Sequence, residues 1–304
     1  MAKILVTGAS GFVGRHLVPA LEARGHAVVE AGRRRRSGAA QHVAISDIGP
    51  ETDWSGKLEG MDCVIHLAGL AHRKAPDEQF HAVNDQGTER LVDACRSAGV
   101  GAFVLLSSIA ARKAEQLPRE ANAYGRSKLA SERHVLHAAE LGSLTGIILR
   151  PPMIYGHDAP GNWHRLQRLA AGSLPLPFGS VHNRRSHCSI DNLCSAIVSA
   201  VEEGVQGSGV YEIADEDQVS LAETLELLRD AMGKKAALLP VPVAILRAAL
   251  AALGQKKLVE SLLDDLQLDP SPFMRAFNWK PPEKAKEAIR KSGRLFAKSS
   301  ESVA

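Results

Sequence analysis

Tyr124 and Lys128 stand four residues apart in a segment, 124–141, whose residue pattern predicts a helix. At that spacing both side chains project from one face of the helix. A free phenol has a pKa of about 10, and a neighbouring ammonium group favours its phenolate form. The pair is therefore typical of a general acid and base that exchanges a proton with a substrate oxygen.

A pair of serines follows a predicted buried strand, Phe103–Leu106. A hydroxyl at the end of that strand can hydrogen-bond the same substrate oxygen. We assign this role to Ser108, with Ser107 as its rival one residue away. A Tyr-x-x-x-Lys spacing is common by chance. It indicates a catalytic pair only in combination with the elements around it.

Short apolar runs alternate with amphipathic segments along the first half of the chain, and this alternation predicts an α/β fold. Because such strands are buried on both faces, we expect a doubly wound, Rossmann-type parallel sheet. The predicted strands are Lys3–Thr7, Ala27–Ala31, Cys63–Leu67, Phe103–Leu106 and Gly146–Leu149.

A glycine-rich turn joins the first strand to the first helix. Gly8 allows the tight turn, Gly11 lets the backbone approach a phosphate, and Gly14 lets the helix pack close to the strand. The helix N-terminus then faces the negative charge of a dinucleotide pyrophosphate. Strand, glycine turn and helix together are the context that this motif requires.

The second strand ends at Gly32, where NAD-binding sites usually place an acidic side chain, and Arg33 to Arg36 follow. A missing carboxylate next to arginines suits the 2′-phosphate of NADP. Glu30 would serve NAD if the register is displaced. The cofactor is therefore NAD(P), with NADP favoured.

The composition excludes some classes of function. Hydrophobic residues make up 45% of the 304 residues, which is ample for a core, and the net charge of +3 is too small to indicate nucleic-acid binding. Four scattered cysteines form no Cys-x-x-Cys pair. We therefore expect reduced thiols, no metal site and a cytoplasmic protein.

Proline and glycine punctuate the chain after Arg150, which predicts a second, smaller domain. The expected division is a cofactor domain at 1–150, to which some later segments return, a smaller α/β substrate domain at 151–290 and a disordered tail at 291–304. We expect no signal peptide. The apolar stretch 241–253 is too short to span a bilayer. It predicts a packed helix, with a helix lying on a membrane surface as the alternative.

These motifs together resemble the extended short-chain dehydrogenase/reductases, in particular the nucleotide-sugar epimerase/dehydratase family, over about residues 3–282. The glycine spacing, the Tyr124-Gly125-Arg126-Ser127-Lys128 helix and Asn278-Trp279-Lys280-Pro281-Pro282 carry the resemblance. It implies catalysis by Ser108, Tyr124 and Lys128, and a homodimer. The residues implied to bind the cofactor are Gly8, Ser10, Gly11, Phe12, Val13, Gly14, Arg33, Asp47, Ile48, Leu67, Ala68, Gly69, Asn84, Ser107, Lys128 and Pro151.

The second half resembles the family's substrate domain. Asn162 and Arg185 resemble residues that hold a nucleotide diphosphate, and Leu176 and Phe178 lie in a segment similar to one that packs on uracil. The resemblance implies a UDP-sugar substrate and a redox reaction at C4 of a UDP-hexose or UDP-N-acetylhexosamine. It is strongest to a subgroup from bacterial surface-polysaccharide pathways, which contains both 4-epimerases and 4-keto reductases.

Two departures from the family's sequence pattern narrow the range of reactions that we expect of this chain. Met153 stands where UDP-galactose 4-epimerases carry an asparagine, and Ile109-Ala110 replace the acidic pair that dehydratases need after the catalytic serine. Epimerase and reductase both stay open, because the same three residues serve both. A carbonyl reductase of a small non-nucleotide substrate is the alternative enzyme. A non-catalytic NADP-sensing regulator is disfavoured, because such proteins usually lose the tyrosine or lysine.

Overall fold

The computed structural model describes residues 1–71, 75–203 and 207–301, apart from the side chains of 256–258, 300 and 301. His72, which the sequence places near the cofactor segment, lies outside these residues. Seven parallel strands form the main sheet in the order β3-β2-β1-β4-β5-β6-β9. They are β1 Lys3–Thr7, β2 Ala27–Gly32, β3 Gln41–Ala44, β4 Cys63–His66, β5 Ala102–Leu106, β6 Thr145–Arg150 and β9 Gly209–Glu212. The predicted doubly wound parallel sheet is confirmed.

The strand order reverses between β1 and β4, which are paired neighbours although β2 and β3 separate them in the chain. The carboxyl ends of the strands beside such a switch point are where doubly wound folds bind ligands. Thr7 and His66 lie opposite each other at these ends. The topology therefore directs the glycine turn after β1 and the segment after β4 to one place.

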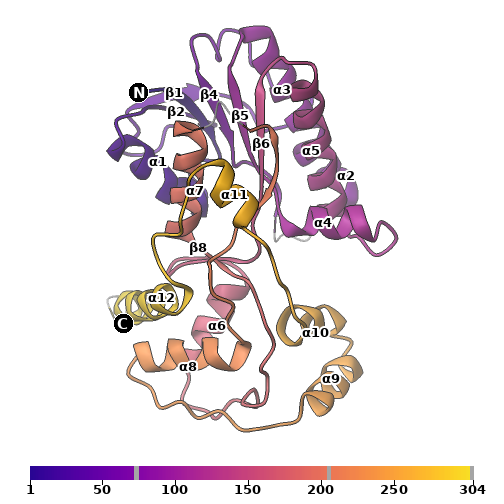
Figure 1. Cartoon of the computed structure of the whole chain (residues 1–304), viewed down its shortest axis with the longest axis vertical. Coiled ribbons are helices and arrows are strands. Elements are labelled where there is room, and N and C mark those ends of the chain that lie inside the picture. Colours follow the sequence, from indigo (N-terminus) through magenta and orange to yellow (C-terminus); the bar gives the residue numbers. More distant parts are fainter. Residues whose placement is uncertain (72–74, 204–206, 302–304) are drawn as a thin grey trace. The chain divides into compact units, whose positions relative to one another are not determined.

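Helices cover both faces of this sheet (Figure 1). The helix α1 lies on one face, and α3 and α5 lie on the other. Between the strands the chain forms α1 Phe12–Ala23, α2 Asp77–Phe80, a stretch of π-helix η1 His81–Gln86, α3 Gly87–Ala98, α4 Ile109–Gln116 and α5 Ala123–Glu140. The short α4 was not predicted from the sequence.

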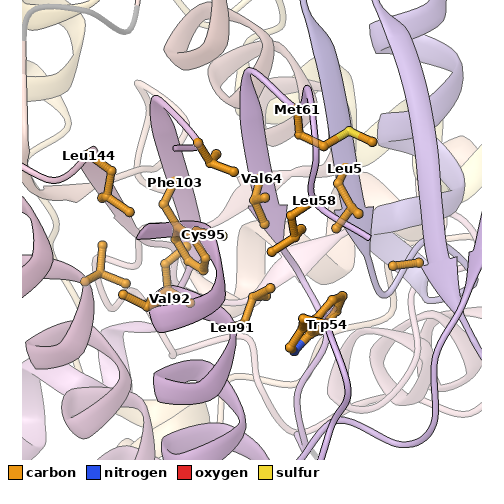
Figure 2. Packing of buried hydrophobic residues seen from close by; sticks show 14 of the residues in the cluster. Leu5, Trp54, Leu58, Met61, Val64, Leu91, Val92, Cys95, Phe103 and Leu144 are labelled. Atoms are coloured by element: carbon orange, nitrogen blue, oxygen red, sulfur yellow. The ribbon is translucent and has the colours of Figure 1, made fainter. Parts of the chain in front are cut away.

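Apolar side chains of α3 pack against the sheet (Figure 2). Leu91 and Cys95 from the helix lie near Val64 and Phe103 of neighbouring strands, and all four side chains are buried. Burial of a side chain of this size contributes about 1.5–3 kcal/mol. This core fixes the helices that later carry the functional side chains.

The chain divides into two compact units, and the division is not a single cut. Unit 1 consists of Met1–Pro151, Leu193–Ile213 and Pro270–Lys280; unit 2 consists of Pro152–Asn192, Ala214–Asp269 and Pro281–Ala304. The helix α7, Ile190–Glu202, runs from unit 2 into unit 1, and α11, Ser271–Ala276, belongs to unit 1. Later segments thus return to the sheet, which β9 completes.

Unit 2 is mainly helical. A two-stranded parallel sheet pairs β7 Ile154–Tyr155 with β8 Cys188–Ser189. The helices are α6 Asn162–Ala171, α8 Leu221–Ala231, α9 Val243–Ala252, α10 Lys256–Leu263 and α12 Ala285–Glu301. Of the helices in the described ranges, none is long and apolar enough to cross a membrane.

The prediction of a disordered tail from 291 was wrong. The helix α12 continues to Glu301 and contacts α8, with its Ile289 and Phe296 buried. Ser292 accepts a hydrogen bond from the indole of Trp163 at 3.0 Å. Ile289 and Phe296 share one face of this helix, but most of the segment is polar, and this low apolar content led to the prediction of a tail.

Candidate active site

The glycine turn after β1 shapes a cradle for a dinucleotide. Gly8 has φ +72°, and a Cβ built there would lie 2.7 Å from the backbone nitrogen of Ala68. A Cβ on Gly14 would lie 2.4 Å from the carbonyl oxygen of Gly8, so only glycine lets α1 start this close to the strand. Within the described residues, α1 begins without a capping side chain or an acidic residue in its first turn. An uncapped helix N-terminus of this kind fits a pyrophosphate. Ser10, Gly11, Phe12 and Val13 lie in this turn and in the first residues of the helix.

The end of β2 carries charge of both signs. Glu30 is buried, and its carboxylate accepts hydrogen bonds from Arg36 at 2.6 and 3.2 Å. The guanidinium of Arg35 donates to the carbonyl oxygens of Ala39 and Ala40. Glu30 is therefore already paired, although it was the residue that would serve NAD.

Arg33 points outward from the same strand end. Its side chain is 73% exposed and lies 3.2 Å from a carboxylate oxygen of Asp47, which is 81% exposed. An ion pair this exposed contributes little to stability and is readily exchanged for another anion. Ile48, the predicted neighbour of adenine, lies close to Gly87, whose Cβ would come within 2.7 Å of it.

A directed chain of hydrogen bonds holds the segment after β4. The backbone N–H of Ala68 donates to the hydroxyl of Thr7 at 3.2 Å, and that hydroxyl lies 2.7 Å from Nδ1 of His66. Nε2 of His66 lies 3.1 Å from the hydroxyl of Thr88, which donates to the carbonyl oxygen of Asn84. Burial and the charge of Lys128 lower the pKa of His66 to about 3, so the ring is neutral. His66 therefore has a structural role. The hydrogen bonds that it links hold Leu67, Ala68 and Gly69 in place.

Asn84 lies in η1 and is buried. Its amide accepts from the backbone N–H of Leu70 at 2.7 Å and donates to the carbonyl oxygen of Leu70 and to the hydroxyl of Ser127. The amide of Asn84, which was predicted to contact the cofactor, thus forms its hydrogen bonds with other parts of the protein. It ties the segment after β4 to α5, and the π-helical turn presents it there.

The hydroxyl of Ser108 lies near enough to that of Tyr124 to influence its pKa. Ser108 caps α4 by accepting from the N–H of Ala110, and Tyr124 lies in the first turn of α5. A Cβ on Gly125 would lie 2.7 Å from the carbonyl oxygen of Ala110, so glycine here allows α5 to approach α4 closely. Burial raises the pKa of Tyr124, and the nearby hydroxyl of Ser108 opposes that rise without cancelling it.

Lys128 lies one turn further along α5 and is buried. Its ammonium donates to the carbonyl oxygen of Leu106 at 2.7 Å. Burial lowers the pKa of Lys128 to about 8, against the attraction of Glu132. A pKa of about 8 keeps the group mostly charged at neutral pH.

Ser107 is not equivalent to Ser108. Its hydroxyl donates to Glu132, and its side chain is buried. The two neighbouring serines point to different partners, because successive residues of an extended segment face opposite ways. The structure therefore places Ser108, and not Ser107, beside Tyr124. Ser107, which was predicted to bind the cofactor, instead binds a buried carboxylate of the protein.

Sequence reasoning missed the ion pair behind this serine. Arg150, the last residue of β6, binds both carboxylate oxygens of Glu132 and also reaches Glu115 at 2.9 Å. Two features of the sequence could have indicated this pair. Glu132 follows Lys128 by one helical turn, and Arg150 ends a strand that is otherwise apolar. Pro151 follows, and its carbonyl oxygen accepts from the N–H of Ile109 at 3.0 Å.

The predicted substrate residues all lie in unit 2. Asn162 is exposed at the start of α6, and Phe178 is half-buried. Leu176 is buried and forms a parallel bridge with Leu238. The guanidinium of Arg185 donates to the carbonyl oxygens of Glu260 and Asp264, so it is engaged with the chain itself.

In the described part of the chain, no group of histidine, cysteine, aspartate or glutamate side chains could hold a metal ion. Cys63, Cys95, Cys188 and Cys194 are all buried and reduced.

Comparisons with known proteins define the class. The model of the family described as "NAD dependent epimerase/dehydratase family" matches residues 4–214. UDP-glucose 4-epimerase of Vibrio cholerae is 30% identical over 312 residues, covering 97% of this chain and 95% of that protein. The chain belongs to the NAD-dependent epimerase/dehydratase family and is an enzyme of the short-chain dehydrogenase/reductase class.

Two further similarities extend this comparison. A 4-hydroxy-2-methyl-3-oxo-4-farnesyl-3,4-dihydroquinoline-1-oxide ketoreductase of Stigmatella aurantiaca is 32% identical, covering 83% of this chain and 80% of that protein. The crystal structure of UDP-glucuronic acid 4-epimerase from Bacillus cereus in complex with NAD superposes with a TM-score of 0.75. That structure is 22% identical and covers 98% of this chain and 99% of its own, and it shows the shared fold.

The glycine cradle makes a prediction with a matched control. Gly8→Ala should lower the affinity for a nicotinamide dinucleotide at least about tenfold, because the methyl group displaces the segment at Ala68 as well as straining a positive φ. Gly25→Ala carries a similar strain at φ +80° but meets no atom within 4 Å. Calorimetric titration should show normal affinity for that control. Equal affinity in the two variants would contradict the assigned cradle.

Proposed function

We propose that this enzyme transfers hydride at C4 of a UDP-hexose or UDP-N-acetylhexosamine, as a 4-epimerase or as a reductase of a 4-keto sugar, in the synthesis of surface polysaccharides. The observation that carries the proposal is that the Ser108 hydroxyl lies near enough to Tyr124 to act on its pKa, one helical turn from the buried Lys128. The similarity to the Vibrio cholerae enzyme over nearly the whole of both chains supports the epimerase.

Tyr124 would exchange the proton of the C4 oxygen, and Ser108 would hold that oxygen with its hydroxyl. Because burial raises the pKa of Tyr124, forming the phenolate requires positive charge nearby. The ammonium of Lys128, which donates to the carbonyl oxygen of Leu106, would supply such charge from the next turn. When bound, the nicotinamide accepts or returns the hydride at C4. An epimerase would return it to the other face of the sugar, whereas a reductase would act once on a 4-keto sugar.

A second candidate is a reductase of a non-nucleotide ketone. The Stigmatella aurantiaca relative, which is named a ketoreductase, supports it. The engagement of Arg185 with backbone carbonyl oxygens also supports it, because a diphosphate would have to compete for that guanidinium. The homodimer implied by the family resemblance stays a prediction.

The end of β2 supports NADP as the cofactor. Glu30 is neutralised by Arg36, Gly32 offers no carboxylate to the ribose, and the exposed Arg33 is available to a 2′-phosphate. In NAD enzymes an acidic residue usually takes the place of Gly32. A reductase that exchanges NADPH in each turnover suits this arrangement.

Titration with NADPH and NADH tests the cofactor. We expect NADPH to bind more tightly, and Arg33→Ala to weaken NADPH about tenfold or more, because a charge-assisted hydrogen bond to the phosphate is lost. The affinity for NADH should not change. Arg24→Ala removes the same charge at a surface ion pair with Glu202 and should leave both affinities unchanged. Tighter binding of NADH by the wild type would contradict the choice of NADP.

Two serine variants test the catalytic assignment. Ser108→Ala should lower turnover of UDP-galactose, UDP-N-acetylglucosamine or a UDP-4-keto-6-deoxy-hexosamine about a hundredfold, because general acid–base geometry at the substrate oxygen is lost. Ser107→Ala should change turnover only a few-fold but cost about 1–2 kcal/mol in the free energy of unfolding, because Glu132 loses a buried donor. NMR of the sugar products and urea unfolding measure the two effects.

The reverse pattern, with Ser107→Ala the less active variant, would overturn the assignment. If no UDP-sugar turns over while a small ketone is reduced in a manner that depends on Ser108, the second candidate replaces the first.

A further inference from the structure

A buried carboxylate lies near the end of β2, on the side of the strand where the ribose of a dinucleotide is expected. Glu30 and Gly32 stand two residues apart on this strand, so they face the same side of the sheet. An acidic side chain about 20 residues after the glycine turn usually binds the ribose hydroxyls of NAD. Glu30 stands at about this distance from Gly8 and is buried. The strand therefore carries a carboxylate of the kind that selects NAD, one step before Gly32.

Arg36 occupies both oxygens of this carboxylate. Its Nη2 donates to Oε1 of Glu30 at 2.6 Å and its Nε donates to Oε2 at 3.2 Å, so a single planar guanidinium binds the whole group. The side chain of Arg36 is 28% exposed and that of Glu30 only 5%, so the arginine lies on the solvent side of the pair. The carboxylate cannot bind a ribose while the guanidinium stays in place.

The positive charge of this pair is permanent. Hydrogen bonds with Glu30 raise the pKa of Arg36 above its usual value, against the effect of burial, and Glu22 of α1 adds attraction. A guanidinium is charged throughout the physiological pH range in any case. Arg33, by contrast, forms its ion pair with Asp47 where both side chains are largely exposed. Of these two arginines, Arg36 is the one whose position is fixed.

The turn after β2 brings Arg36 to Glu30. The carbonyl oxygen of Arg36 accepts from the backbone N–H of Ala39 at 3.1 Å, and the guanidinium of Arg35 donates to the carbonyl oxygen of Ala39 at 2.8 Å. Gly38 has φ +84° within this turn, and Ala39 is buried. The chain thus folds back on itself after the strand, and this fold places Arg36 over the strand face.

The strand end has room for a ligand. Apart from its chain neighbours, a Cβ built on Gly32 would meet nothing closer than the carbonyl oxygen of Arg34, at 3.9 Å, so packing does not require glycine there. The bonds to Glu30 leave Nη1 of Arg36 without a hydrogen-bond partner among the described residues. A charged donor of this kind suits a phosphate oxygen. The strand end thus offers space and a fixed donor, while the carboxylate of Glu30 stays covered.

We propose that Arg36 determines the choice of cofactor by covering Glu30. The guanidinium withholds the carboxylate from the ribose hydroxyls of NAD, and Nη1 donates to the 2′-phosphate of NADP. A purely structural ion pair would stabilise the turn without affecting the choice between the two dinucleotides. This role rests on the preference for NADP proposed above, and it is independent of the reaction at C4.

Titration calorimetry with NADH and NADPH tests this role in Arg36→Met, which removes the charge and keeps a long side chain. We expect this variant to bind NADH about tenfold more tightly than the wild type does, because the uncovered carboxylate gains hydrogen bonds to the ribose. It should bind NADPH at least about tenfold more weakly, because that carboxylate repels the 2′-phosphate. Adding Glu30→Gln to Arg36→Met should abolish the gain for NADH.

Glu30→Gln alone keeps the test decisive if Arg36→Met does not fold, since it removes the buried negative charge instead of leaving it without a partner. This variant should bind NADPH about threefold or more tightly than the wild type, because the charge of Arg36 is no longer neutralised. Its affinity for NADH should not change. Circular dichroism shows which variants are folded.

Arg35→Met is the matched control. Arg35 lies next to Arg36 in the same turn, but its guanidinium donates to the carbonyl oxygens of Ala39 and Ala40 and not to a carboxylate. This variant should bind NADH like the wild type.

Three results would overturn the role of Arg36 while a preference of the wild type for NADPH still stands. They are a folded Arg36→Met variant without a gain for NADH, a gain that survives the addition of Glu30→Gln, and a Glu30→Gln variant with unchanged affinity for NADPH. A wild type that binds NADH more tightly than NADPH overturns both proposals, because Glu30 would not be withheld from the ribose.

Discussion

The buried ion pair between Glu132 and Arg150 fixes the catalytic helix to the sheet. Glu132 has an exposed fraction of 1%, and three contacts join its carboxylate to the guanidinium. Removing one partner of such a pair leaves an uncompensated buried charge, at a cost of about 3–5 kcal/mol. The pair is therefore a constraint that holds α5 in one position relative to β6.

The position of α5 decides the geometry of the site. Tyr124 meets Ser108 because α5 approaches α4 at Gly125, and Lys128 reaches Leu106 at the end of β5. On its other side α5 receives a hydrogen bond from Asn84, which also holds the segment after β4. The cofactor cradle and the catalytic side chains are thus linked through one helix, and a displacement of that helix would move both.

The sequence predicted the parts whose signals are local. Alternating buried strands, the Gly8 turn and the spacing of Tyr124 and Lys128 each appear within a few residues, and the five strands expected from the sequence are present. The edge strands β3 and β9 were not predicted, because their residues are only half-buried or exposed and carry no apolar pattern. Other contacts join residues that lie far apart in the sequence. They are the hydrogen bonds that link His66 to Asn84 and the ion pair of Glu132 with Arg150. Only the folded chain shows which serine faces Tyr124.

The most direct test of C4 chemistry follows a deuterium atom placed at C4 of UDP-galactose and of UDP-N-acetylglucosamine. After incubation with the enzyme and oxidised cofactor, mass spectrometry and NMR locate the label. We expect deuterium to move to the opposite face of C4 in the epimer, or onto the nicotinamide if the enzyme works as a reductase in reverse. Label that stays in place on both sugars, in an enzyme that reduces a non-nucleotide ketone, would contradict hydride transfer at C4 of a UDP-sugar.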